Sequence, residues 1–142
     1  MIRLAVILMC MAGQASALSC LPHAVEDAFN QANDAPEVYQ VVHGRLAFDG
    51  ALLPRTDHDP MHLPEDAVIP ARIVGNSLTR NGFTNPVALN VTFEVQCYAS
   101  WCGGGVPGAD YLAFLRQDAG TWVLQTNPCG GFAFAKPSRV QL

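Results

Sequence analysis

The sequence has little positive charge. Among its 142 residues, 8 are Lys or Arg and 12 are Asp or Glu, so the formal net charge at pH 7 is -4. Domains that bind nucleic acid carry a clustered excess of basic residues that neutralises phosphates, and this chain has no such excess. We therefore expect no nucleic acid among its partners, and the acidic balance is typical of a surface that keeps a protein soluble.

Long apolar runs are also scarce. The one clear run lies at the start, where Arg3 precedes an apolar segment at residues 4–12 and the small residues Ala15, Ser16 and Ala17 follow. This order is typical of a secretory signal peptide, and the run is too short to span a bilayer as a helix. The sequence predicts cleavage after Ala17, a single mature domain at residues 18–142 without a transmembrane segment, and a periplasmic or secreted protein.

Cysteines are few, and their number indicates disulfides. Cleavage would remove Cys10 and leave Cys20, Cys97, Cys102 and Cys129. An even number in an exported domain predicts two disulfide bonds, and four cysteines permit three pairings. A lipid-modified Cys20 is the competing interpretation. Because lipidation would leave an odd thiol, we expect no lipid anchor at Cys20.

The common patterns of catalytic sites are missing. No serine, histidine and acid set stands at a recognised spacing, and the four residues between Cys97 and Cys102 exclude a redox C-x-x-C motif. Gly103-Gly104-Gly105 lacks the lysine and the following helix of a phosphate loop. We therefore predict that the protein is not an enzyme.

The periodicity of the mature chain predicts one short helix and five strands. Residues 22–33 form an amphipathic helical pattern with Pro22 in its first turn. Residues 87–97 alternate strictly between apolar and polar side chains, as a strand with one buried face requires. The alternating apolar residues are Val87, Leu89, Val91, Phe93, Val95 and Cys97. The other expected strands cover residues 37–49, 67–79, 111–117 and 121–125.

Glycine and proline mark where these strands bend or end. Gly44 suggests a bulge, Pro70 suggests a sheet edge or a bend, and Arg80-Asn81-Gly82 is a turn signal. Residues 50–65 carry three prolines and should form a long exposed loop. Because closure hides strand edges in so short a chain, we predict a mainly β fold, a five-stranded antiparallel OB-like barrel with one short N-terminal helix.

Several short motifs follow one another along the mature chain. Cys20-Leu21-Pro22 runs into a helix with Ala28-Phe29 and a valine-rich strand, Cys102-Gly103 follows the central strand, and a hairpin with Tyr111-Leu112 closes at Cys129. This set resembles the netrin-like module, the OB-fold barrel shared by tissue inhibitors of metalloproteinases. In that family the N-terminal cysteine before the proline is joined to the cysteine after the last hairpin.

The resemblance therefore implies a bond between Cys20 and Cys129, which leaves Cys97 with Cys102. The alternative pairing is Cys20 with Cys102 and Cys97 with Cys129. The inhibitors begin with a cysteine whose free amine and carbonyl bind the protease zinc, whereas this chain should begin at Leu18. Asn30 also stands where that family has another cysteine. The resemblance thus implies a protein-binding role rather than the protease-inhibitory mechanism.

Two sets of residues are candidates for binding. Tyr98 and Trp101 flank the cysteine loop and could form an exposed aromatic tip for a protein partner, or else pack over a disulfide. The segment 57–62 offers carboxylate, imidazole and thioether groups that suit copper or zinc in an oxidising compartment. Its proposed metal ligands are Asp57, His58, Asp59 and His62. A polar loop with incidental histidines is the alternative, so we expect a binding module without a cofactor, and a periplasmic metal-binding protein as the second hypothesis.

Overall fold

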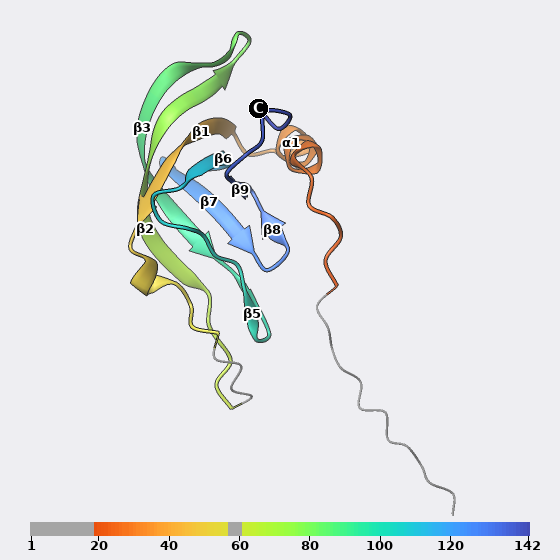
Figure 1. The fold of residues 1–142 in the computed structure, drawn as a ribbon, viewed down its shortest axis with the longest axis vertical. Helices are drawn as coiled ribbons and strands as arrows, with labels where there is room; N and C mark the ends of the chain where they lie inside the picture. The colour runs from red at the N-terminus through yellow and green to blue at the C-terminus, as the bar shows by residue number, and fades with distance from the viewer. Residues whose placement is uncertain (1–18, 57–60) are drawn as a thin grey trace, which may run out of the picture.

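The computed structural model describes residues 19–56 and 61–142, so the predicted signal peptide and residues 57–60 lie outside it. The described chain is mainly β, with one α-helix (Figure 1). Within these residues no helix has the length and apolarity to cross a bilayer. The elements are α1 (Val25–Asp34), β1 (Tyr39–Phe48), the 3-10 helix η1 (Gly50–Leu52), β2 (Ala67–Thr79), β3 (Gly82–Val95), β4 (Cys97–Tyr98), β5 (Trp101–Cys102), β6 (Asp110–Asp118), β7 (Thr121–Asn127), β8 (Gly130–Gly131) and β9 (Ala133–Ala135).

Seven strands form one mixed sheet in the order β8-β7-β3-β2-β1-β6-β9, and β4 and β5 form a separate hairpin. β7 also pairs with β6, so the pairings of β1, β2, β3, β7 and β6 follow one another in a cycle. β3 and β7 run parallel, and the other pairs are antiparallel. The predicted five-stranded antiparallel barrel is therefore wrong in the number of strands and in the direction of one pair. Periodicity shows which residues share a face, but it does not show which neighbour a strand pairs with.

The main core lies on the inner face of this cycle of strands. The alternation predicted for residues 87–97 is confirmed as far as Val95, since Val91, Phe93 and Val95 of β3 are buried, but β3 begins at Gly82 and Cys97 belongs to β4. The cross-strand register places them beside inward residues of β2 and β7, such as Ile69 and Leu124, which are also buried. Burial of these aliphatic and aromatic side chains is the dominant favourable term in the folding of the sheet.

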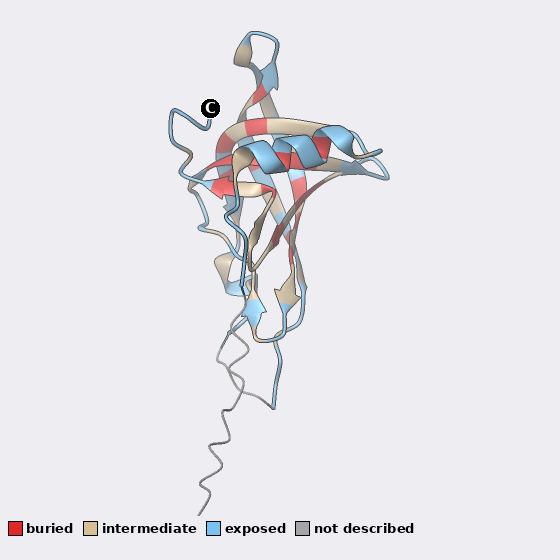
Figure 2. Cartoon of the chain, turned by 90° about the vertical axis from the view of Figure 1, so that its right-hand side faces the viewer, coloured by how far each residue is buried: buried red, intermediate tan, exposed pale blue. Residues whose placement is uncertain are grey.

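A second apolar layer covers the outer face of β1 and β6. Leu112 and Phe114 of β6 point to this face and are buried, as are Ala28 and Ala32 of α1. Figure 2 shows α1 lying across the strands, with buried residues on the helix side that faces them. The C-terminal residues Phe132 and Phe134 are also buried in this layer. They fold back onto β6, where Phe134 pairs with Leu112 and its ring lies 6.1 Å from that of Phe114.

The helix begins later than predicted. Ala24 is extended, with φ -100° and ψ 147°, so Val25 is the first helical residue and Pro22 lies outside the first turn. Glu26 and Asp27 do occupy the first turn, where negative charge compensates the helix dipole. Phe29 belongs to the apolar side of the helical pattern, yet it is 48% exposed.

Gly44 and Gly75 pair with each other across β1 and β2, at a point where the two backbones lie close together. A Cβ atom on Gly44 would lie 2.6 Å from the carbonyl oxygen of Val74, and a Cβ atom on Gly75 would clash with the carbonyl oxygen of His43. The register passes through this pair without a shift, so the predicted bulge at Gly44 is wrong. The irregularity lies at Ser77 and Leu78 in the pairing of β2 with β3. Close approach of two backbones and a bulge both favour glycine, and the sequence pattern did not distinguish them.

Two disulfides join the four cysteines of the described chain. They are Cys20–Cys129, with a sequence separation of 109, and Cys97–Cys102, with a separation of 5. This is the pairing that the resemblance to the netrin-like module implied. The first bond fastens the segment before α1 to the turn between β7 and β8, and the second closes the hairpin of β4 and β5.

Candidate functional site

The predicted partner-binding residues Tyr98 and Trp101 form a cross-strand pair on the hairpin of β4 and β5. Their side chains are 43% and 46% exposed, respectively. Residues that face each other across an antiparallel pair project to the same side. The hairpin therefore carries two aromatic side chains on one side, and both are partly exposed to solvent.

The hairpin is held by several bonds at its base. The Cys97–Cys102 disulfide joins its two strands, and the Gly103 N–H donates to the Gln96 carbonyl at 2.8 Å. The Tyr98 hydroxyl donates to Gln96 Oε1 at 3.3 Å. Positive φ at Ala99, 53°, belongs to the turn itself. The backbone that carries the aromatic pair is thus fixed before any partner arrives.

The long loop reaches the same end of the molecule. The Cys97 N–H donates to Asp66 Oδ1 at 2.6 Å, which fastens the end of the loop to the start of the hairpin. Figures 1 and 2 both show the loop and the hairpin at the end opposite the tip of β2 and β3. Met61 and Leu63 of this loop are exposed apolar residues. The structure therefore places the long loop beside the hairpin that carries Tyr98 and Trp101, and we call this part of the molecule the aromatic end.

The predicted metal ligands are only partly described. Asp57, His58 and Asp59 lie outside the described residues, and His62 is exposed. Among the described side chains, no group of three or more His, Cys, Asp or Glu residues is close enough to hold a metal ion. A copper or zinc site in this loop stays a prediction from the sequence.

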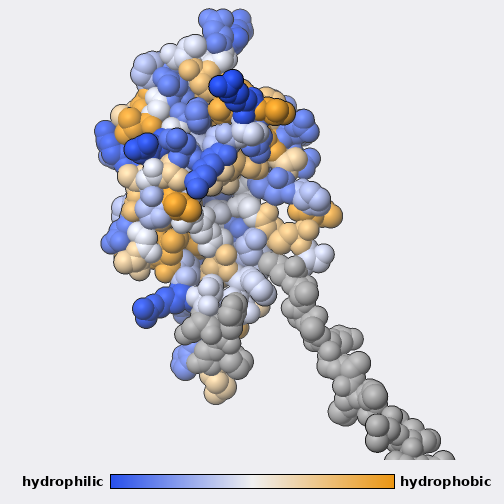
Figure 3. All heavy atoms as spheres, viewed as in Figure 1, coloured by the Kyte–Doolittle hydropathy of each residue, from blue (hydrophilic) through white to orange (hydrophobic). Residues whose placement is uncertain are grey.

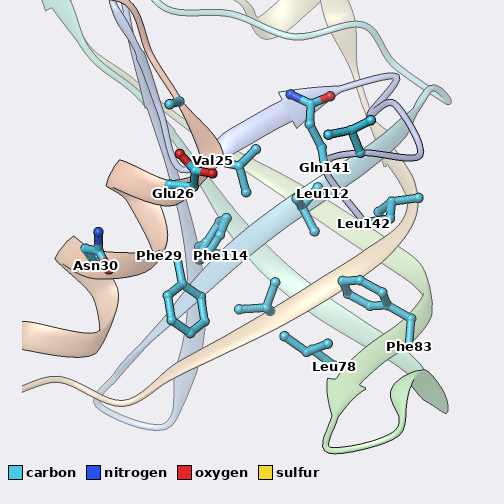
Figure 4. Close-up of a pocket in the computed structure, with 13 residues that line it drawn as sticks. Val25, Glu26, Phe29, Asn30, Leu78, Phe83, Leu112, Phe114, Gln141 and Leu142 are labelled. Atoms are coloured by element: carbon cyan, nitrogen blue, oxygen red, sulfur yellow. The ribbon is translucent and has the colours of Figure 1, made fainter.

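An apolar groove that the sequence did not predict lies between α1 and the β2–β3 hairpin, with a volume of about 750 Å³. Val41, Leu112 and Phe114 form its floor, and the final residues Val140 and Leu142 lie along it. Figure 4 shows Phe29 of α1 and Leu78 and Phe83 of the hairpin projecting into the space between the elements. The register explains the floor, since Val41 pairs with Phe114 and both point to the outer face.

The charges around the groove are separated by sign. Glu26 of α1 is the one ionisable side chain in the lining that the structure describes, and Asp27 follows it on the helix. Arg80 stands in the turn between Leu78 and Phe83, next to these two lining residues but outside the lining. Within the described chain none of these three charged residues takes part in an ion pair. The helix side of the groove is therefore acidic, whereas Arg80 of the hairpin turn and Arg139, which precedes Val140, lie beside the lining without being part of it.

The sequence carried a partial signal for this groove. Leu78 and Phe83 are large apolar residues on either side of a tight turn, a position where polar residues are more common, and both pair with each other across the hairpin. The helix, the floor and the C-terminal wall come from distant parts of the chain. Their meeting depends on the tertiary fold, which local pattern does not encode.

A second hollow of about 600 Å³ lies on the outer face of β2 and β3. Val68, Pro70 and Thr92 line it together with Arg72 and Asn90. The Arg72 guanidinium donates to Asn90 Oδ1 at 3.1 Å, so its charge is already partly engaged. This hollow has neither exposed aromatic rings nor separated charges, and we consider it a weaker candidate than the aromatic end or the groove.

The aromatic end and the groove remain as surfaces with a clear physical character, one rigid and aromatic, the other apolar with an acidic helix side. Comparison of the chain with protein-family models, with curated proteins and with solved structures finds no match.

Proposed function

We propose that this protein is an exported, non-enzymatic binding module that contacts a partner protein through the aromatic end. The observation that carries this proposal is the exposed pair of Tyr98 and Trp101 on a hairpin closed by a disulfide. Tyrosine and tryptophan are enriched among the residues that dominate binding energy at protein interfaces. A hairpin that is already fixed loses little conformational entropy when it binds.

The two disulfides favour a location in an oxidising compartment, which the protein reaches by export. Both disulfides, Cys20–Cys129 and Cys97–Cys102, need an oxidising environment to form and persist. This supports the periplasmic or secreted location that the signal-peptide pattern of residues 1–17 predicts. The proposal therefore places the partner outside the cytoplasm as well.

The strand pairings support an OB-like arrangement within the larger sheet. Five strands pair in a cycle, in the order β1, β2, β3, β7 and β6, as the strands of a small Greek-key barrel do. The short strands β8 and β9 pair with β7 and β6, respectively. The Cys20–Cys129 bond supports a netrin-like relationship because the resemblance implied this pairing. Loops at the end of a barrel are a common place for binding residues because the rigid strands position them.

Partner capture and affinity measurements test the proposed function. The mature chain, residues 18–142, is used to recover partners from the oxidising compartment, and the affinity of each recovered protein is then measured by calorimetry. Because interface hot spots cost about 2 kcal/mol or more, Tyr98→Ala with Trp101→Ala should weaken binding about 30-fold.

Val74→Ala is the matched control, since Val74 is 51% exposed on the outer face of β2, away from the aromatic end. It should leave the affinity unchanged. Thermal unfolding checks that the double variant still folds. If the double variant binds the recovered partner with wild-type affinity, the aromatic end is not the binding surface.

A further inference from the structure

We propose that the apolar groove is the interface of a homodimer, in which two copies of the chain pack groove against groove about a two-fold axis parallel to the groove. This proposal concerns a different surface from the aromatic end and goes beyond the proposed function. Its basis is the combination of exposed apolar side chains, an acidic residue in the lining on the helix side and a basic residue at the tip of the hairpin.

The apolar side chains that line the groove are unusually exposed for residues of their size. Phe29 is 48% exposed and Leu78 41% exposed, and Val140 and Leu142 are also exposed. All four residues line the same groove, and Figure 4 shows Phe29 and Leu78 projecting into it. Contiguous exposed apolar surface of this kind marks interaction sites, because its burial is favourable by about 25 cal/mol per Å².

The charges indicate which partner covers the groove. An occupant must be apolar and must carry positive charge toward α1, because Glu26 lines the groove and Asp27 adjoins it. The β2–β3 hairpin of a second copy has this chemistry, since Arg80 stands between Leu78 and Phe83. Figure 1 shows this hairpin projecting beyond the rest of the sheet, and Figure 3 shows a hydrophilic tip above apolar residues. An anionic amphiphile would instead meet a lining that has a carboxylate and no cation.

Symmetry then selects one arrangement of the two copies. A homodimer with a two-fold axis uses the same patch on both subunits. An axis parallel to the groove places α1 of each copy against the hairpin of the other, so Glu26 approaches the second copy's cationic turn at position 80. An axis across the groove would place the two acidic helices together, and like charges repel. Charge complementarity therefore favours the parallel axis.

Sedimentation velocity of the mature chain over a concentration series, from about 1 to 200 μM, tests this dimer. We expect a concentration-dependent monomer–dimer equilibrium for the wild type. Phe29→Asp places a charge in the apolar contact and should raise the dimer dissociation constant at least about 10-fold. Val74→Asp, on the outer face of β2, is the matched control and should not change it.

A charge exchange tests the arrangement of the two copies. Glu26→Arg and Arg80→Glu should each weaken the dimer, and the double variant should recover most of the loss because opposite charges again face each other. Thermal unfolding of each variant separates loss of the dimer from loss of the fold.

Three outcomes would overturn the proposal. One is a wild type that stays monomeric at every concentration in the series. Binding of a cationic amphipathic peptide in the groove of such a monomer would be one form of this outcome. Another is a dimer insensitive to Phe29→Asp. The third is a double charge variant no better than the single variants, which excludes the parallel axis.

Discussion

Two glycines determine how closely β1 and β2 approach each other. Gly75→Ala should destabilise the protein by about 2 kcal/mol or more, because overpacking of this kind forces the backbone apart and the new Cβ atom would clash with the His43 carbonyl oxygen. Gly104→Ala is the matched control, since a Cβ atom there meets nothing within 4 Å. Denaturant unfolding of both variants measures the two free energies, and equal values would show that the strands separate without cost.

Single residues also explain where the sequence interpretation went wrong. The bulge predicted at Gly44 is wrong because a bulge and a close backbone approach call for the same residue type. The sheet edge predicted at Pro70 is confirmed. Pro70 pairs with Thr92 of β3, but the last pair of β2 with β1 is at Ala71, one residue away. At Pro70, β2 therefore has β3 as its single neighbour, and the missing N–H of proline costs little.

At the scale of elements, the long strands β1, β2, β3, β6 and β7 were predictable, and the strands of two or three residues were not. β2 has the bounds that the sequence predicted, and the buried residues of β3 are those that alternate. β8 and β9 have two and three residues, too few to show a period. Tyr98 and Trp101 were found because cysteines on either side marked their loop, whereas the groove joins segments from both ends of the chain.

The two disulfides should differ strongly in their contribution to stability. In the chain-entropy account, replacing Cys20 and Cys129 by serine should cost about 5 kcal/mol, and replacing Cys97 and Cys102 should cost about 2 kcal/mol. The reason is the length of chain that each bond closes, with separations of 109 and 5 residues. Urea unfolding of the two double variants checks the order, and losses of equal size would contradict the entropic explanation.

At the scale of the whole molecule, the two candidate surfaces lie at different ends. Figures 1 and 2 show the hairpin of β4 and β5 at one end and the tip of β2 and β3 at the other, with α1 nearer the second. Packing through the groove would therefore leave both aromatic ends of a dimer exposed. A dimer of this form would present two partner sites, and a partner with two copies of its own epitope would bind it with added avidity.

The layered architecture also predicts which part of the molecule opens last. β6 is buried on both faces from Tyr111 to Leu115, with β1 on one side and β9 or β7 on the other. We expect its central amides to exchange hydrogen only on global unfolding, with free energies within about 1 kcal/mol of the value from urea. Residues 82–90 of β3 pair with β2 alone and should exchange through smaller openings. Hydrogen exchange followed by NMR measures both sets in one sample. Faster exchange in β6 than in this part of β3 would mean that the outer layer of α1 and the C-terminal segment contributes little to holding the sheet closed.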